Sequence, residues 1–166
     1  MEVKVIRSKR RKKTISARLI DGGVLEIRAP QNISEEELRE AIEKLGGRLQ
    51  RKRRLRAEKA DAALQGRAQE LNRRYFDGKL RWHSIRYVTN QKRSSGSCTP
   101  GKGTIRLSDR LRDYPAWVRD YVIVHELAHL IEPNHSRRFW DLVNRYPKTE
   151  RARGFLIAMG MEQDEG

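Results

Sequence analysis

Alternation of apolar and polar residues predicts three short strands at the start of the chain. They cover 3–7, 14–20 and 24–28, and the Asp-Gly-Gly segment 21–23 between the last two is typical of a hairpin turn. We therefore expect a small antiparallel sheet that ends at Pro30.

A helical period follows this sheet. Ser34 and Glu37 form a capping box, which predicts a helix that begins there and reaches at least Leu45. The pair Gly46-Gly47 is expected to kink or interrupt this helix, since glycine weakens a helix interior.

The next segment is dominated by cations. Residues 48–59 include seven Lys or Arg residues, and only Leu49 and Leu55 are large and apolar, which favours an exposed helix or a linker. A second helix is expected over 61–76, where apolar residues recur at helical spacing, and Asp77-Gly78 is a stop signal.

The remainder of the chain predicts more strands and then helices. The predicted strands are 85–88, 104–107 and a Ser- and Gly-rich edge strand over 94–98, and the predicted helices are 115–131, 136–145 and 147–159. Strands followed by helices predict the α+β class. We expect two parts, an N-terminal β-hairpin with a basic helix over 1–60 and a larger domain over 61–166.

Composition restricts the class of protein. The chain has 166 residues, of which 37% are hydrophobic and 36% charged. It contains no run of 18 apolar residues, so no membrane span is predicted. The N-terminus has no apolar stretch typical of a secretory signal. Cys98 is the single cysteine, which excludes an internal disulfide and favours a cytoplasmic protein.

The formal net charge of +15 attracts phosphates, nucleic acid or anionic surfaces. The basic runs 7–13 and 48–59 make nucleic acid a candidate partner. The competing interpretation is a genome that favours arginine in all its proteins.

The candidate chemistry is concentrated in His125-Glu126-Leu127-Ala128-His129, an H-E-x-x-H motif within an apolar helix. Residues four apart share a helical face, so both imidazoles can reach one ion. The carboxylate of Glu126 can then approach a zinc-bound water, whose pKa zinc lowers toward about 7, and take its proton. The alternative is two partly buried histidines on an amphipathic helix.

His135 supplies a candidate third ligand. It follows Pro133-Asn134, and a turn there can bring it back toward His125 and His129. Three protein ligands with an open fourth position are typical of catalytic zinc, and one cysteine cannot build a cysteine-rich structural site.

The spacing also occurs in metzincins, but Glu132 occupies the position of their glycine and no feature marks Met159 or Met161 as a Met-turn. The Glu132 side chain either hydrogen-bonds a ligand imidazole or is solvated. His83 is expected to be a surface or satisfied histidine.

The segment 121–140, YVIVHELAHLIEPNHSRRFW, resembles the signature of the YgjP-like metallopeptidase domain family. Further marks of the resemblance are an Arg-rich N-terminal hairpin, Arg-Ala-Pro at 28–30, Gly-Ser-Cys at 96–98 and Thr-Ile-Arg-Leu at 104–107. The segment 71–80 is also similar to the helix-to-strand entry of SprT-like metalloproteases, which act on proteins crosslinked to DNA. Ser95 departs from the family, which usually has tryptophan there.

The resemblance implies a compact, gluzincin-like (minigluzincin) fold with a small sheet beside an active-site helix, and zinc as the cofactor. The leading hypothesis is a metallopeptidase over 61–166, whose edge strand 94–98 could pair with an extended substrate. Two alternatives stay open. One is a metal-dependent nucleotide pyrophosphohydrolase that uses Arg93, Arg106, Arg137 and Arg138 to bind phosphates, and the other is a nucleic-acid-binding protein with a zinc-stabilised fold.

Overall fold

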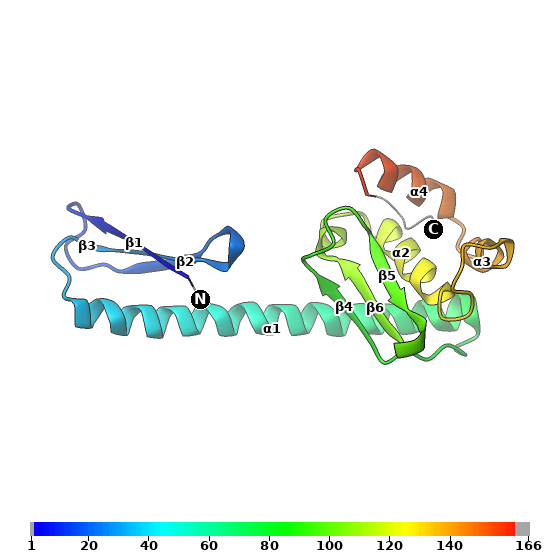
Figure 1. The fold of residues 1–166 in the computed structure, drawn as a ribbon, viewed down its shortest axis with the longest axis horizontal. Helices are drawn as coiled ribbons and strands as arrows, with labels where there is room; N and C mark the ends of the chain where they lie inside the picture. Colours follow the sequence, from blue (N-terminus) through cyan, green and yellow to red (C-terminus); the bar gives the residue numbers. More distant parts are fainter. Residues whose placement is uncertain (1, 162–166) are drawn as a thin grey trace. The chain divides into compact units, whose positions relative to one another are not determined.

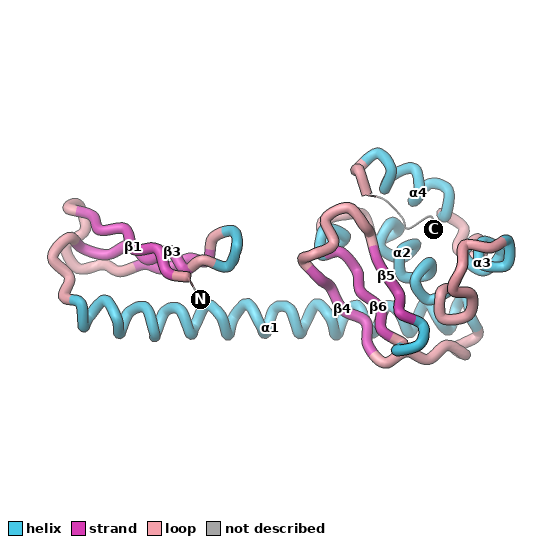
Figure 2. The backbone as a smooth tube through the Cα atoms, viewed as in Figure 1, coloured by secondary structure: helices cyan, strands magenta, loops and turns pink. Residues whose placement is uncertain are grey.

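The computed structural model describes residues 2–161 and divides the chain into two compact units (Figure 1). The first unit runs to Glu58 and the second begins at Lys59. Each unit contains one three-stranded sheet and its own apolar core (Figure 2). The longest helix, α1 (Glu35–Phe76), contributes its N-terminal part to the first unit and its C-terminal part to the second.

The sheet of the first unit consists of β1 (Val3–Ser8), β2 (Ser16–Leu19) and β3 (Leu25–Pro30) in the order β1-β3-β2. Strands β2 and β3 form the predicted antiparallel hairpin, whose turn places Gly22 and Gly23 at a φ of 79°. Strand β1 pairs with β3 in parallel, so the expectation of a purely antiparallel sheet is wrong. The reason is that the basic loop after Ser8 carries the chain to the opposite edge of β3.

Alternate residues of β3 form the core of this unit. Leu25, Ile27 and Ala29 are fully buried and pack with Leu38 of α1. Further positions of α1 at helical spacing, Ile42 and Leu49, pack against the same cluster.

Helix α1 is continuous over 42 residues, so the expected interruption at Gly46-Gly47 does not occur. The helices expected over 34–45 and 61–76 are parts of one helix, and residues 48–59 between them are also helical. The predicted capping box is present, because Ser34 Oγ accepts from Glu37 N at 3.1 Å and Glu37 Oε2 accepts from Ser34 N at 3.1 Å. Each glycine costs a helix about 1 kcal/mol relative to alanine, which is too little to end one with strong helix formers on both sides. The helix ends at the predicted stop, where Gly78 adopts a φ of 68°.

The sheet of the second unit has the order β4-β6-β5, with β4 (Ser84–Val88), β5 (Gly96–Thr99) and β6 (Thr104–Ser108). The central strand β6 pairs in parallel with β4 and antiparallel with β5, so this sheet is also mixed. The predicted edge position of the Ser- and Gly-rich strand is confirmed.

Helix α2 (Ala116–Ala128) is the centre of the second unit. Nearly every residue from Val118 onward is buried, because β5, β6, α3 (Arg137–Val143) and α4 (Thr149–Ala158) all contact α2. A helix that is apolar on all sides must be covered on all sides. The α+β class, with a small sheet beside a central helix, is therefore confirmed.

No helix within residues 2–161 is both long enough and apolar enough to cross a membrane. The apolar α2 has 13 residues, which is short of the roughly 20 that a span needs, and the longer α1 is rich in charged residues.

Candidate metal centre

After the end of α2 the chain folds back toward the last turn of this helix. The helix ends at Ala128, earlier than the predicted limit of 131, and the chain continues in a tighter turn, in which Ile131 N donates to the Ala128 carbonyl at 3.0 Å. The chain then turns at 133–134, and Ser136 caps α3 by accepting a hydrogen bond from Phe139 N at 3.3 Å. Ser136, the first residue of the predicted helix 136–145, is thus the N-cap of α3, and His135 lies in the connection between two helix ends.

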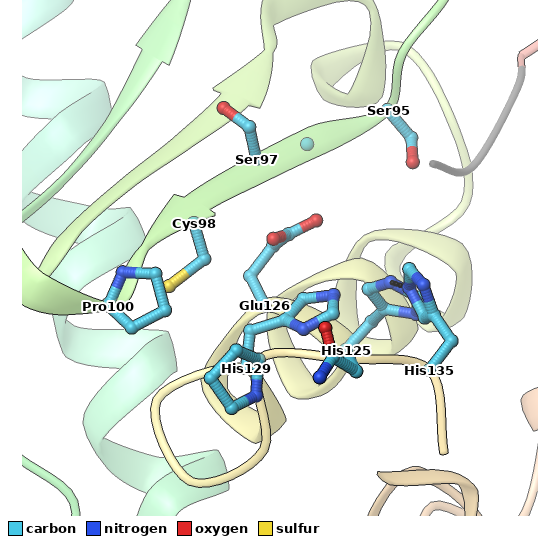
Figure 3. Close-up of a pocket in the computed structure, with 11 residues that line it drawn as sticks. Ser95, Ser97, Cys98, Pro100, His125, Glu126, His129 and His135 are labelled. Atoms are coloured by element: carbon cyan, nitrogen blue, oxygen red, sulfur yellow. Dashed lines mark hydrogen bonds between the residues drawn. The ribbon is translucent and has the colours of Figure 1, made fainter. Parts of the chain in front are cut away.

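Three histidines converge at this point (Figure 3). Ring nitrogens of His125, His129 and His135 all lie within 4.8 Å of one another, and Nε2 of His125 is 3.3 Å from Nε2 of His135. Two imidazole nitrogens at about 2.0–2.1 Å from one tetrahedral zinc ion would lie about 3.3–3.4 Å apart. The arrangement therefore fits a divalent metal ion.

The opposite ring nitrogens of two of these histidines are held by neighbouring groups. His129 Nδ1 lies 3.2 Å from the backbone oxygen of Glu132, and His125 Nδ1 lies 3.4 Å from the hydroxyl of Tyr121. Such contacts set the tautomer and leave Nε2 for a metal. Glu132 thus takes part through its backbone carbonyl, whereas the sequence analysis considered only its side chain, either on an imidazole or solvated.

The protonation state of His125 also suits metal binding. The side chain is 3% exposed, and burial, followed by the charges of His129 and His135, lowers the pKa of His125 well below its ordinary value. The neutral imidazole, which is the form that binds a metal, is thereby favoured.

Phe139 packs against all three imidazoles. Its ring centroid lies 4.9 Å from that of His125, 4.4 Å from that of His129 and 4.7 Å from that of His135, and the side chain is fully buried. The sequence pattern did not assign this role to Phe139. Phe139 limits the orientations that the three rings can adopt.

The carboxylate of Glu126 reaches from α2 toward β5 and is 4% exposed (Figure 3). A Cβ atom at position 96 would lie 2.6 Å from Glu126 Oε1, so only glycine leaves room for this carboxylate. Glycine inside a strand often marks such a close approach. The sequence pattern located Gly96 in an edge strand but did not connect it with Glu126.

A cavity of about 280 Å³ opens over these groups. Its walls are the three histidines, Glu126, the segment 95–98, Pro100 and the turn 133–134. Cys98 also lines this cavity, and its sulfur lies beside Pro100 (Figure 3). Burial, followed by the charge of Glu126, raises the pKa of the Cys98 thiol to about 12. The raised pKa favours the protonated thiol.

Other residues singled out in the sequence lie elsewhere. Ser95 is 2% exposed and forms part of the cavity wall. His83 is exposed and does not belong to the histidine group. The arginines considered for phosphate binding are exposed and none of them lines the cavity: Arg93, Arg106, Arg137 and Arg138.

Comparison with known families agrees with this geometry. The model of the family described as "YgjP-like, metallopeptidase domain" matches residues 57–156, a range that includes the whole histidine group. The chain belongs to the YgjP-like metallopeptidase family. It is therefore a metallohydrolase, and its family implies a bound metal ion. The N-terminal marks of the resemblance lie outside the matched range.

A solved structure shares the fold of the YgjP-like domain. The metallopeptidase zymogen abylysin of Pyrococcus abyssi superposes with a TM-score of 0.51 at 23% identity, over 60% of this chain and 97% of abylysin. The similarity shows a common compact fold. No curated protein matches the chain significantly.

We expect Phe139→Leu to weaken zinc binding by about tenfold, the scale found when groups that orient metal ligands are removed. The shorter side chain loses the ring contacts that hold the three imidazoles. Competition with a chromophoric chelator measures the affinity. Phe76→Leu is the matched control, since Phe76 is buried in the same unit and has no ring contact with the histidines. Parental zinc affinity in a folded Phe139→Leu would contradict the assignment.

Proposed function

We propose that this metallopeptidase is zinc-dependent, with His125, His129 and His135 as ligands and Glu126 as general base. The observation that carries the proposal is the convergence of three imidazole nitrogens beside one buried carboxylate. Three ligands leave a coordination position for water or substrate, as in catalytic zinc sites. The proposal places the catalytic function in the predicted domain 61–166.

In the proposed peptide hydrolysis, the metal ion and the side chain of Glu126 have separate roles. When bound, zinc supplies Lewis acidity that polarises a carbonyl and lowers the pKa of a water molecule to about 7. Glu126 accepts a proton from the attacking water at a carboxylate oxygen. Glu126 then delivers this proton to the departing amide nitrogen, so that hydrolysis leaves a carboxylic acid and an amine.

We further propose that an extended peptide pairs with β5. This strand forms ladder hydrogen bonds with β6 on one side and is at the edge of the sheet on the other. Residues of β5 also line the cavity that contains Glu126. Pairing of a peptide with an exposed strand edge would bring its backbone carbonyls past the histidine group.

The cavity favours a peptide over a nucleoside triphosphate. No Lys or Arg is among its lining residues, whereas sites that bind several phosphates use such side chains. The neutral Ser, Cys, Pro and Asn side chains of the wall suit an uncharged peptide backbone.

His135→Ala should lower zinc affinity by at least tenfold, because it removes one of three proposed ligands. Metal content after dialysis against a weak chelator, determined by mass spectrometry, measures the effect. His83→Ala, which changes an exposed histidine outside the group, should keep one zinc ion per chain. Unchanged zinc affinity in His135→Ala would overturn the role of the third ligand.

Glu126→Gln should lower kcat for peptide hydrolysis by about 10²–10⁴-fold, the usual contribution of a general base. Glutamine keeps the size of the side chain but cannot take the proton from water. Zinc content should match that of the parent, which separates this result from loss of the metal. Parental kcat in the zinc-loaded variant would show that Glu126 is not the base.

Gly96→Ala should reduce peptide hydrolysis by at least tenfold while zinc content stays constant. The added methyl group would lie 2.6 Å from Glu126 Oε1 and displace the carboxylate. Gly101→Ala is the control, since a Cβ at that position meets no atom within 4 Å. Equal activities of the two variants, measured with one quenched-fluorescent peptide, would contradict the proposed placement of Glu126.

A further inference from the structure

A basic loop and a lysine of α1 that is distant in the sequence meet in the first unit. Lys12 and Lys13 belong to the loop between β1 and β2, and Lys44 belongs to α1. All three line one open cavity at the surface of this unit. The fold thus joins the basic loop to the basic part of the helix.

From Lys44 the positive charge continues along α1. Arg48, Lys52 and Arg56 follow at intervals of four residues, so each is about 6 Å further along the helix axis on nearly the same side. All of these side chains are exposed. We call the following set the cationic surface: Lys12, Lys13, Lys44, Arg48, Lys52 and Arg56.

No ion pair or hydrogen bond occupies these six side chains within residues 2–161. Other arginines of the unit are paired, as Arg18 and Arg28 are with Glu26. Like charges four residues apart on a helix repel one another, so the arrangement opposes helix stability. A polyanion bound along this side would remove the repulsion.

Two acidic residues, Glu37 and Glu40, also line the cavity next to Lys44. The Glu37 carboxylate is engaged by the hydroxyl and the backbone N–H of Ser34, which lowers its pKa. Both acids precede Lys44 in α1, and between Lys44 and Arg56 the helix has no acidic residue. The positive charge beyond Lys44 is therefore not compensated along the helix.

We propose that the cationic surface binds the phosphate backbone of double-stranded nucleic acid, a function beyond peptide hydrolysis. The first 58 residues contain no Phe, Trp or Tyr, so this unit lacks the aromatic side chains on which proteins that bind single strands stack successive bases. Contacts from lysine and arginine to phosphates need no base recognition, which makes the binding independent of nucleotide sequence.

A membrane surface fits the same helix less well. Interfacial helices need an apolar face beside their cations. The apolar positions Leu38, Ile42 and Leu49 of α1 already pack against the sheet of the first unit. Leu55, at 44% exposure, is the large apolar residue that α1 leaves exposed in the described chain.

Fluorescence anisotropy of the full chain with a labelled DNA duplex of mixed sequence, titrated at several salt concentrations, tests the proposal. Six phosphate contacts predict a slope of log affinity against log salt of about −5. The triple variant Arg48→Gln, Lys52→Gln, Arg56→Gln should reduce the slope by about 3 and the affinity at low salt by at least tenfold. Glutamine maintains helix propensity, which circular dichroism verifies.

The matched control is Arg39→Gln, Lys102→Gln, Lys148→Gln, which removes the same charge from exposed positions outside the cationic surface. This control should retain parental affinity within threefold, and both triple variants should retain peptidase activity. The proposal would be overturned if the two triple variants lost equal affinity for the duplex, or if the affinity did not change with salt concentration. Tighter binding to phosphatidylserine vesicles than to the duplex would also overturn it. Duplex binding by Glu126→Gln should equal that of the parent, so the result does not depend on the catalytic assignment.

Discussion

Helix α2 is buried on all sides by neighbouring elements, and it carries His125 and Glu126 among its apolar side chains. The surrounding elements must therefore accommodate two polar groups in the interior. Each is less than 5% exposed. Charged or polar groups in such surroundings are unfavourable unless they are paired or bind a metal. The neighbouring strand and loop therefore do more than cover α2, because they also define where polar atoms can lie.

Two close approaches satisfy this constraint. Strand β5 comes near enough to α2 to enclose the Glu126 carboxylate, and Gly96 is the position at which any side chain would collide with it. On the other side, the loop after α2 returns His135 to within 3.3 Å of His125, and Phe139 packs against all three rings. Gly96 thus leaves room for the Glu126 carboxylate, and Phe139 holds the three imidazoles, so that all four groups line one cavity.

The first unit presents different physical chemistry. Its core is one face of a small sheet packed on α1. The family match begins at residue 57, so the basic residues of this unit lie outside the shared domain. The chain therefore combines a metallopeptidase domain with a separate unit whose exposed charge is suited to a polyanion.

The sequence by itself determined the local features. The H-E-x-x-H spacing, the cap at Ser136 and the alternation of β6 are short-range patterns, because helical and strand periods decide which side chains share a face. The same local reasoning failed at Gly46-Gly47, where the helix formers on both sides outweigh the cost of two glycines.

Only the tertiary structure decided how distant segments meet. The parallel pairing of β1 with β3, the approach of Gly96 to Glu126 and the convergence of Lys12 with Lys44 each join segments that are separated in the chain. No local pattern contains these contacts, because they depend on packing between whole elements, which is set by the shapes of the buried side chains. The three candidate histidines could therefore be identified from the chain, whereas the room for the carboxylate of Glu126 is a property of the packed fold.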